Sequence, residues 1–265
     1  MIRLLAVDMD GTCLNRKNQI SEQNMAALRR LVQSGIQIVP ASGRACTCLP
    51  HQLRAAPLLF RYAITSNGAR VDDVRGHCLF CQEIYPDTAL SLLSDCQTLR
   101  IGVSAHIRRE YLLQGRLLQM MGKAVYGKDA EQARCVPDLR PLIKQSRGVE
   151  ELQFYFFSRT AREALRQILS YYPTLNAAYS SSYVEIFSAE ASKGKALSAL
   201  AQHLHLDRSQ IACIGDSEND LSMFEAAGTR FAVGNAIDAL KQQADHVLPD
   251  RDHGPIGATA AILGI

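Results

Sequence analysis

Five short apolar runs, separated by segments with helical periodicity, constrain the fold of this chain more than any other feature. Each run is rich in apolar residues, and the only strongly polar residues in the five runs are one glutamine, one threonine and one arginine. Continuous apolar strands of this kind suit a parallel sheet that helices cover on both faces. The runs are LLAV (4–7), IQIV (36–39), YAIT (62–65), IACI (211–214) and RFAV (230–233).

Helical patterns lie between these runs. In residues 21–35, Met25, Leu28 and Leu31 fall on one face, Ser21 is placed to cap the helix, and Gly35 to end it. Residues 193–205 and 218–228 also have helical patterns. The order strand, helix, strand predicts an α/β protein with a doubly wound, Rossmann-like parallel sheet.

The alternation stops near residue 67, where Asn67-Gly68 predicts a hairpin. Residues 84–187 mix helical segments with strand-like ones, and the first pattern resumes at about residue 188. We therefore expect a discontinuous core, residues 1–83 and 188–265, with an inserted α/β domain, residues 84–187. The segments of the insert are helical at 87–96 and 160–169 and strand-like at 151–157 and 183–187.

Composition excludes several classes of protein. The chain of 265 residues is 47% hydrophobic and 21% charged, as in a globular protein. It has no apolar run long enough for a membrane helix and no signal-peptide pattern, so we expect a cytoplasmic protein. A net charge of +3 is too small for a nucleic-acid-binding surface. Nothing in the sequence implies an obligate protein partner.

The chain has eight cysteines, which this context predicts to be reduced thiols. Cys78 and Cys81 form a CxxC pair. A zinc site would need a second pair at suitable spacing, and a redox role would need a thioredoxin-like context. The sequence supplies neither, so we expect no metal or redox role for this pair.

Polar residues follow the predicted core strands. In an open α/β sheet, ligands bind beyond the carboxyl ends of the strands. Three strands and one helix start would bring a set of functional groups to that edge. These are Asp8, Asp10, Ser42, Gly43, Arg44, Lys193, Asp216, Asn219 and Asp220.

Asp8 and Asp10 are two residues apart on an extended segment, so their side chains address one small volume. Two carboxylates that close need a cation or a shared proton. Magnesium prefers oxygen ligands, and Asp8 and Asp216 could hold it. Together with a lysine and a hydroxyl, this is the inventory for phosphoryl transfer, with an aspartate as the nucleophile.

Four motifs stand at these positions in the order DMDGT (8–12), SGR (42–44), SKG (192–194) and GDSEND (215–220). They resemble the Cof-type branch of the haloacid dehalogenase superfamily and occur in that family's order across nearly the whole chain. The NGA of 67–69 also resembles that branch. The resemblance implies a core with an inserted cap domain. It also implies a magnesium-dependent phosphatase of small phosphorylated metabolites, such as sugar phosphates, that works through an aspartyl-phosphate.

The resemblance also implies residue roles. Asp8 would be the nucleophile and a magnesium ligand. Asp10 would be the general acid and base and would bind magnesium through its backbone carbonyl. Asp216 would complete the metal site, and Asp220 would orient the ligands or the metal-bound waters. The phosphate would be bound by Met9 (through its backbone), Ser42, Gly43, Lys193 and Asn219.

Some alternatives stay open. Ser42 could cap a helix, and Lys193 could be an exposed helix residue. Arg44 and Asn67 are candidate substrate contacts. Cys13 stands where this family more often has leucine, which we interpret as a change in packing.

Two other functions also stay open. A phosphotransferase or phosphomutase would need a second phosphate grip, for which Arg108 and Arg109 are candidates. A non-catalytic, phosphorylatable signalling domain is less consistent with Asp10 and with the large insert. Tyr183 is a further candidate for specificity, and the sequence does not define the substrate.

Overall fold

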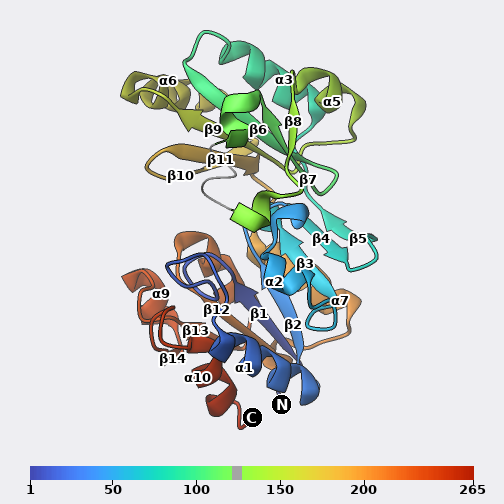
Figure 1. Ribbon diagram of the computed structural model, residues 1–265, viewed down its shortest axis with the longest axis vertical. Coiled ribbons are helices and arrows are strands. Elements are labelled where there is room, and N and C mark those ends of the chain that lie inside the picture. The colour runs from blue at the N-terminus through green and yellow to red at the C-terminus, as the bar shows by residue number, and fades with distance from the viewer. Residues whose placement is uncertain (121–126) are drawn as a thin grey trace. The chain divides into compact units, whose positions relative to one another are not determined.

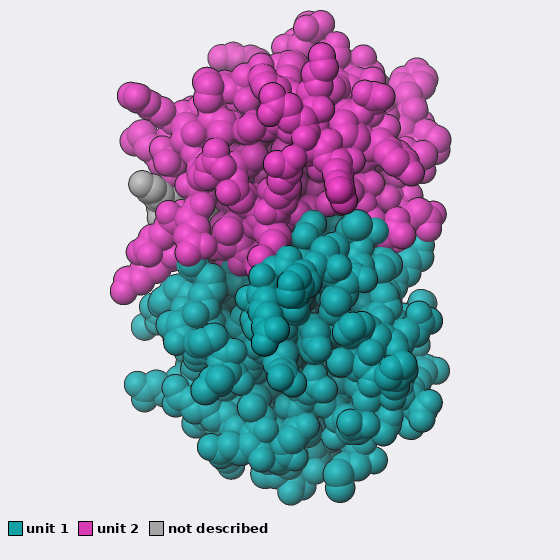
Figure 2. Space-filling view, turned by 90° about the vertical axis from the view of Figure 1, so that its right-hand side faces the viewer, with its two compact units in different colours: residues 1–43, 49–81, 192–265 teal, residues 44–48, 82–191 magenta. Residues whose placement is uncertain are grey.

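The computed structural model describes residues 1–120 and 127–265, which form two compact units. Unit 1 comprises residues 1–43, 49–81 and 192–265, and unit 2 comprises residues 44–48 and 82–191, as Figure 2 colours them. The short segment 44–48 groups with unit 2, although it lies between two segments of unit 1. The domain limits expected from the sequence, at 83/84 and 187/188, stay predictions.

Unit 1 is built on an eight-stranded sheet with the order β14-β13-β12-β1-β2-β3-β4-β5 (Figure 1). Strands β14 to β3 run parallel, and β4 and β5 are antiparallel additions at one edge. The strands are β1 (Leu4–Asp8), β2 (Gln37–Ala41), β3 (Tyr62–Thr65), β4 (Arg70–Asp73), β5 (Cys78–Cys81), β12 (Ile211–Gly215), β13 (Thr229–Ala232) and β14 (His246–Val247).

Helices cover both faces of this sheet. The connection from β1 to β2 and the connection from β12 to β13 run in opposite directions along the sheet. Because crossovers between parallel strands are right-handed, α1 and α8 must lie on opposite faces. Helix α10 packs on α1, and α7 packs on α8. The helices of unit 1 are α1 (Glu22–Gln33), α2 (His51–Arg54), α7 (Lys193–His203), α8 (Leu221–Ala226), α9 (Asp238–Gln243) and α10 (Pro255–Ile262).

The apolar runs form the centre of unit 1. All five residues of β1 are buried, and β1 pairs with β12 on one side and β2 on the other. The capping of α1 also agrees with the sequence, because Ser21 Oγ accepts a hydrogen bond from the backbone N–H of Asn24. The predicted doubly wound parallel sheet is confirmed.

Unit 2 has a six-stranded sheet with the order β10-β11-β9-β6-β7-β8, antiparallel except for the β7–β8 pair. Its strands are β6 (Ile101–Ile107), β7 (Glu110–Gln114), β8 (Arg134–Val136), β9 (Glu151–Phe156), β10 (Leu175–Tyr179) and β11 (Tyr183–Ser188). Its helices include α3 (Pro86–Asp95), α5 (Arg140–Gln145) and α6 (Arg159–Leu169).

The two faces of the unit 2 sheet differ. Ala105, Leu152 and Phe154 belong to an apolar cluster with the residues of α3, α5 and α6. The alternating side chains Ser104 and Gln153 are polar, buried and hydrogen bonded to each other at 3.2 Å. Alternation along the strands therefore separates an apolar, helix-covered face from a polar one.

Short 3₁₀ turns complete the two units: η1 (Cys46–Cys48), η2 (Ser66–Gly68), η3 (Gly127–Ala130), η4 (Arg208–Gln210) and η5 (Glu218–Asp220). The turn η2 joins β3 to β4, which pair antiparallel, so the hairpin predicted at Asn67-Gly68 is present. In the described part of the chain, no helix combines the length and the hydropathy that crossing a membrane would require.

Candidate active site

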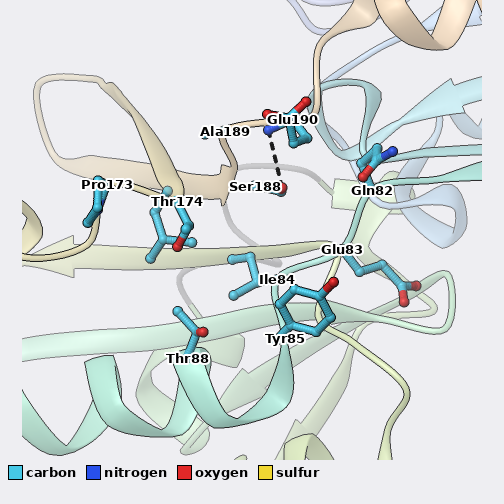
Figure 3. A pocket seen from close by; sticks show the side chains of 11 residues that line it. Gln82, Glu83, Ile84, Tyr85, Thr88, Pro173, Thr174, Ser188, Ala189 and Glu190 are labelled. Carbon is cyan, nitrogen blue, oxygen red and sulfur yellow. Dashed lines mark hydrogen bonds between the residues drawn. The ribbon is translucent and has the colours of Figure 1, made fainter.

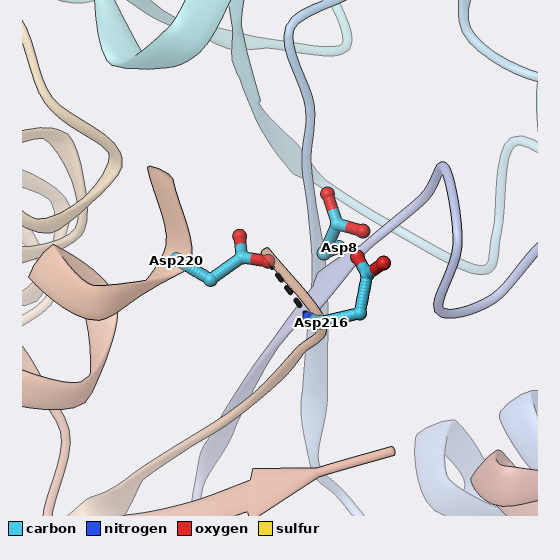
Figure 4. Close-up of side chains that lie close together, drawn as sticks. All are labelled: Asp8, Asp216 and Asp220. Atoms are coloured by element: carbon cyan, nitrogen blue, oxygen red, sulfur yellow. Dashed lines mark hydrogen bonds between the residues drawn. The ribbon is translucent and has the colours of Figure 1, made fainter. Parts of the chain in front are cut away.

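Three carboxylates meet beyond the carboxyl ends of β1 and β12 (Figure 4). Asp8 is the last residue of β1, and Asp216 directly follows β12. Asp220 ends the turn η5. Each carboxylate offers one oxygen, and these oxygens all lie within 4.8 Å of one another. The parallel pairing of β1 with β12 brings together residues that are more than 200 positions apart in the sequence.

Lys193 joins two of these carboxylates. It is the first residue of α7, whose N-cap Ser192 accepts a hydrogen bond from the backbone N–H of Lys195. Lys193 Nζ donates to Asp8 Oδ1 and to Asp220 Oδ1, both at 2.7 Å. Because only 1% of Lys193 is exposed, the alternative of a solvated helix residue is wrong.

Asp220 also fixes the loop that carries Asp216. Its second oxygen, Oδ2, accepts hydrogen bonds from the backbone N–H groups of Asp216 at 2.9 Å and Ser217 at 3.1 Å. The fully buried Asp220 thus accepts hydrogen bonds both from Lys193 and from the backbone of the loop that carries Asp216. Asp220 is also part of the carboxylate cluster, and its predicted role in orienting the metal ligands or the metal-bound waters stays a prediction.

The loop after β1 closes against Asp216. Thr12 Oγ1 donates to Asp216 Oδ1 at 3.2 Å. Gly11 has a φ of +92°, and a Cβ added there would lie 2.2 Å from Asp216 Oδ2. The glycine of the DMDGT motif is therefore required both by its left-handed backbone and by the close approach of this carboxylate.

Burial and mutual repulsion shift the ionisation of the cluster. Burial, followed by the negative charge of Asp220, raises the pKa of Asp8 well above its ordinary value, against the opposing effect of Lys193. Burial and Asp220 likewise raise the pKa of Asp216 to about 6. Burial alone would lower the pKa of Lys193, but the charges of Asp220 and Asp8 outweigh it and raise that pKa. Lys193 is therefore a fixed cation at neutral pH.

One buried oxygen of the cluster has no hydrogen-bond partner in the described part of the chain, and it is Asp8 Oδ2. A buried carboxylate oxygen beside other carboxylates needs a cation or a proton. The candidate ligand atoms of the cluster are carboxylate oxygens, and magnesium prefers oxygen ligands. The side chains present thus fit a divalent cation at Asp8 and Asp216.

Asp10 is not one of the three clustered carboxylates. Met9 is buried, whereas Asp10 is exposed. The backbone carbonyl of Met9 accepts from the N–H of Leu14 at 2.9 Å, which turns the chain back after β1. The predicted binding of magnesium through the backbone carbonyl of Asp10 stays a prediction.

The predicted phosphate-binding residues Ser42 and Asn219 are linked through Asn67. The buried Ser42 accepts, with its backbone carbonyl, from the N–H of Asn67 at 3.2 Å. Asn67 Oδ1 in turn accepts from Asn219 Nδ2 at 2.8 Å. The next helical turn begins at Cys46, so the helix-capping alternative for Ser42 is wrong. Gly43 follows Ser42 and is partly exposed.

The remaining candidates belong to unit 2 and have partners there. The buried Arg44 donates from Nη1 to Asp129 Oδ2 at 2.7 Å and to the carbonyl of Cys48 at 3.2 Å. Arg108 Nη2 donates to the carbonyl of Gln145, and Arg109 Nη2 to Cys46 Sγ. These contacts give each guanidinium a structural partner, while their predicted contacts with substrate stay predictions.

Tyr183, the remaining specificity candidate, begins β11, and its ring lies 5.6 Å from the ring of Tyr155. Unit 2 also has a pocket of about 260 Å³, which Figure 3 shows. No residue that we predicted to be catalytic lines it. Its lining comes from the chain at 82–85, Thr88, 173–175 and 188–190.

Sequence reasoning missed Thr12 as a partner of Asp216, and Asp129 as the partner of Arg44. Thr12 lies inside a motif that was already identified, so its position could have suggested the contact. Asp129 is 85 residues from Arg44, and no local pattern connects them.

Comparison with known proteins agrees with the fold and the site. The family model for haloacid dehalogenase-like hydrolases matches residues 5–258. A 5-amino-6-(5-phospho-D-ribitylamino)uracil phosphatase of Bacillus subtilis, YwtE, is 26% identical, with 96% of each chain covered. An HMP-PP phosphatase of Klebsiella pneumoniae is 28% identical, with 93% of this chain and 89% of that protein covered.

A solved structure is also similar. The haloacid dehalogenase-like hydrolase from B. subtilis superposes with a TM-score of 0.83 at 26% identity, over 99% of this chain and all of that one. The chain belongs to the haloacid dehalogenase-like hydrolases, in their Cof-type branch. The predictions of this family and of an enzyme of the phosphatase class are confirmed.

Proposed function

We propose that this protein is a magnesium-dependent phosphatase that hydrolyses small phosphorylated metabolites through an aspartyl-phosphate on Asp8. The arrangement around Asp8 carries the proposal. One oxygen of Asp8 bonds to Lys193, and the other is buried beside Asp216 without a hydrogen-bond partner in the described part of the chain. Lys193 thus fixes one oxygen of Asp8, and the other oxygen stays available for reaction.

Magnesium would be held by the side chains of Asp8 and Asp216 and by the backbone carbonyl of Asp10. When bound, it would supply positive charge to the oxygens of the phosphoryl group. Thr12 and Asp220 orient Asp216 through its side chain and its backbone N–H respectively. Lys193 balances part of the negative charge of the cluster at every stage of the reaction.

The first step transfers the phosphoryl group to the protein. An oxygen of Asp8 attacks phosphorus, and the bond between phosphorus and the ester oxygen breaks. Asp10, in its acid form, gives a proton to the leaving alkoxide. The exposure of Asp10, one residue beyond the buried Met9, supports its contact with a substrate that arrives from solvent.

The second step releases phosphate. Asp10, now a carboxylate, takes a proton from a water molecule that attacks phosphorus, and the bond to the Asp8 oxygen breaks. Proton transfer by a positioned carboxylate is typically worth about two to four orders of magnitude in rate. Met9, Ser42, Gly43, Lys193 and Asn219 are the proposed contacts of the phosphoryl oxygens.

The substrate class is proposed from the relatives. YwtE is named for a phosphorylated ribitylaminouracil, and another relative is named an HMP-PP phosphatase. Both named substrates carry phosphate on a small organic molecule. A likeness in fold alone extends to a sugar phosphatase of the same superfamily, at 18% identity. We infer a small phosphorylated metabolite, with sugar phosphates included in the class.

The test is phosphate release from a panel of phosphomonoesters, with and without magnesium. Asp8→Asn should abolish release, and Asp10→Asn should reduce it by about two to four orders of magnitude. Glu225→Gln, an exposed carboxylate on α8, is the matched control and should leave release unchanged. Release that persists in Asp8→Asn, or that does not need magnesium, would refute the proposal.

Among the described residues, no specific contact favours the alternative function, a phosphomutase. Arg108 and Arg109, the predicted contacts for a second phosphate, donate to protein atoms of unit 2. Mass balance separates the two reactions, because a mutase returns an isomer and a phosphatase releases inorganic phosphate.

A further inference from the structure

The thiol pair Cys78 and Cys81 lies on β5, the edge strand of the unit 1 sheet. Both residues are exposed and both are free thiols. In a regular strand, residues three apart point to opposite faces, so their thiols would not meet. The structure departs from that rule at this position.

A β-bulge brings the two side chains to one face. Cys81 pairs with Arg70 and Cys78 pairs with Asp72, with a register shift between them. Arg70 and Asp72 are two apart on β4 and share a face, where Arg70 Nε donates to both oxygens of Asp72. Residues directly opposite in an antiparallel pair lie on the same face. Cys78 and Cys81 therefore share the face of this ion pair.

The same register shortens the distance between the two cysteines. The three residue steps from Cys78 to Cys81 on β5 lie opposite only two steps, from Asp72 to Arg70, on β4. Two steps of a strand span about 6.8 Å, whereas three would span about 10 Å. Disulfides join Cα atoms that are about 4.4–6.8 Å apart, so the bulge brings the pair to the upper end of that range.

A hydrogen bond holds the Cys78 thiol close to the backbone of its own strand. The side chain of Cys78 donates from Sγ to the carbonyl of Phe80 at 3.4 Å, within the short segment between the two cysteines. Burial, partly offset by Arg70, together with the interactions with Cys81 and Asp72, raises the pKa of Cys78 to about 11. Cys78 is therefore protonated at neutral pH, and its reaction with an oxidant should accelerate as pH rises.

We propose that Cys78 and Cys81 form a reversible intramolecular disulfide and are a thiol–disulfide exchange site of this protein. The co-reactant is a low-molecular-weight disulfide such as oxidised glutathione. One cysteine of the pair, as its thiolate, attacks one sulfur of that disulfide and releases one thiolate. The other cysteine, once deprotonated, attacks the sulfur of the first and releases the second thiolate. The protein loses two electrons, the oxidant gains them, and the two protons pass to the released thiolates.

The position of the pair gives the cross-link a consequence. Cys81 is the last residue of unit 1 before the chain continues into unit 2 at Gln82. A disulfide would fix the end of an edge strand whose outer hydrogen-bonding groups face no other strand among the described residues. In the oxidised protein, a disulfide would thus join the two sides of the β-bulge directly before the chain enters unit 2.

The experiment equilibrates the reduced protein in buffers of reduced and oxidised glutathione, followed by acid quenching, alkylation and mass spectrometry. Cleavage after Arg75 and after Glu83 yields a peptide that contains Cys78 and Cys81 and excludes Cys96. We expect this peptide to lose two hydrogens as the buffer becomes more oxidising, and to regain them on reduction. Formation should accelerate as pH rises towards the pKa of Cys78.

Single variants test the pairing. In Cys78→Ser and in Cys81→Ser, the remaining cysteine should retain glutathione as a mixed disulfide. Cys135→Ser, a partly exposed cysteine of unit 2, is the control and should leave the internal disulfide unchanged. Circular dichroism verifies that each variant is folded. Glutathione on both cysteines of the wild-type protein, or two free thiols in every buffer, would overturn the proposal.

Discussion

At the scale of single residues, Lys193 is the most constrained side chain of the site. It is a fully buried cation between two buried carboxylates, Asp8 and Asp220. Replacing both ions of such a group with apolar residues can be neutral, whereas removing one ion leaves an uncompensated charge. Lys193 therefore stabilises the fold in addition to its proposed role toward phosphate.

We expect Lys193→Met to lower the free energy of unfolding by about 3–5 kcal/mol at pH 7.5, because it strands two buried carboxylates. The loss should shrink as pH falls, since protonation of Asp8, whose pKa is already raised, removes one of the stranded charges. Urea unfolding followed by circular dichroism at pH 7.5 and pH 5 measures both effects.

Lys195→Met is the matched control, because Lys195 is an exposed lysine in the same turn of α7. We expect a change within about 0.5 kcal/mol for this variant. Equal destabilisation by the two variants, or a Lys193→Met penalty that grows toward acid pH, would contradict the electrostatic interpretation.

The residues of the candidate site were predictable where a motif follows a predicted strand. Interaction partners that are distant in the sequence were much less predictable. Asp8, Lys193 and Asp216 were identified from their motifs, and the structure brings them together with Asp220. Arg44 was interpreted as a substrate contact, but its position depends on Asp129, on a separate segment of unit 2. Only the fold determines such a pair.

At the scale of elements, the turn η2 and the start of α7 form one assembly. Ser66 and Asn67 both have positive φ values, +50° and +54°, which are uncommon for residues with side chains. Gly68 follows with a φ of +87° and packs directly against the backbone of Ser192 and Lys193. The turn therefore supports the N-terminus of the helix that positions Lys193.

We expect Gly68→Ala to destabilise the protein and to reduce phosphatase activity. A Cβ at this position would lie 2.2 Å from the backbone carbonyl of Ser192, so the start of α7 must shift. The left-handed backbone alone costs a residue with a side chain about 1–2 kcal/mol, and the clash adds to it. Urea unfolding and turnover of the best panel substrate are the measurements.

The Gly35→Ala variant measures the effect of backbone strain in the absence of a steric clash. Gly35 has a φ of +91°, but a Cβ there would meet no atom within 4 Å. Its free energy of unfolding should fall by about 1–2 kcal/mol with turnover unchanged. Similar losses of stability and turnover in both variants would show that the contact with α7 is not important.

Elements with a strong pattern were predictable from the sequence, and irregular ones were not. The run YAIT coincides with β3, and the helical pattern at 21–35 contains α1. Strand β14 has only two residues, too few to form a pattern. The bulge that pairs Cys78 with Cys81 depends on the register of β4 against β5, which neither strand specifies alone. The sequence alone therefore predicts no metal or redox role for the pair.

At the scale of the whole molecule, each unit has its own apolar cluster. Chains of this kind need not unfold in a single transition. The seven histidines are divided unevenly, with His106 in unit 2 and the others in unit 1. His106 is 1% exposed, and its Nδ1 lies 3.6 Å from Glu151 Oε1.

His106 predicts how the stability of unit 2 depends on pH. Burial lowers the pKa of His106 from 6.5 to about 3. Between these values the unfolded chain binds a proton that the folded chain does not. The free energy of unfolding therefore decreases as pH falls through this window, by about 1.4 kcal/mol per pH unit. Above pH 6.5 the histidine is neutral in both states and contributes no pH dependence.

We expect wild-type unit 2 to lose about 2 kcal/mol more stability between pH 6.5 and pH 4.5 than unit 2 of His106→Gln, which cannot take up this proton. Hydrogen exchange pulses across a urea series, read on peptides from β6 and β9, report unit 2 separately from unit 1. His203→Gln, an exposed histidine of α7, should retain the wild-type pH dependence. If His106→Gln loses stability as steeply as the wild type, then another group controls the acid sensitivity of unit 2.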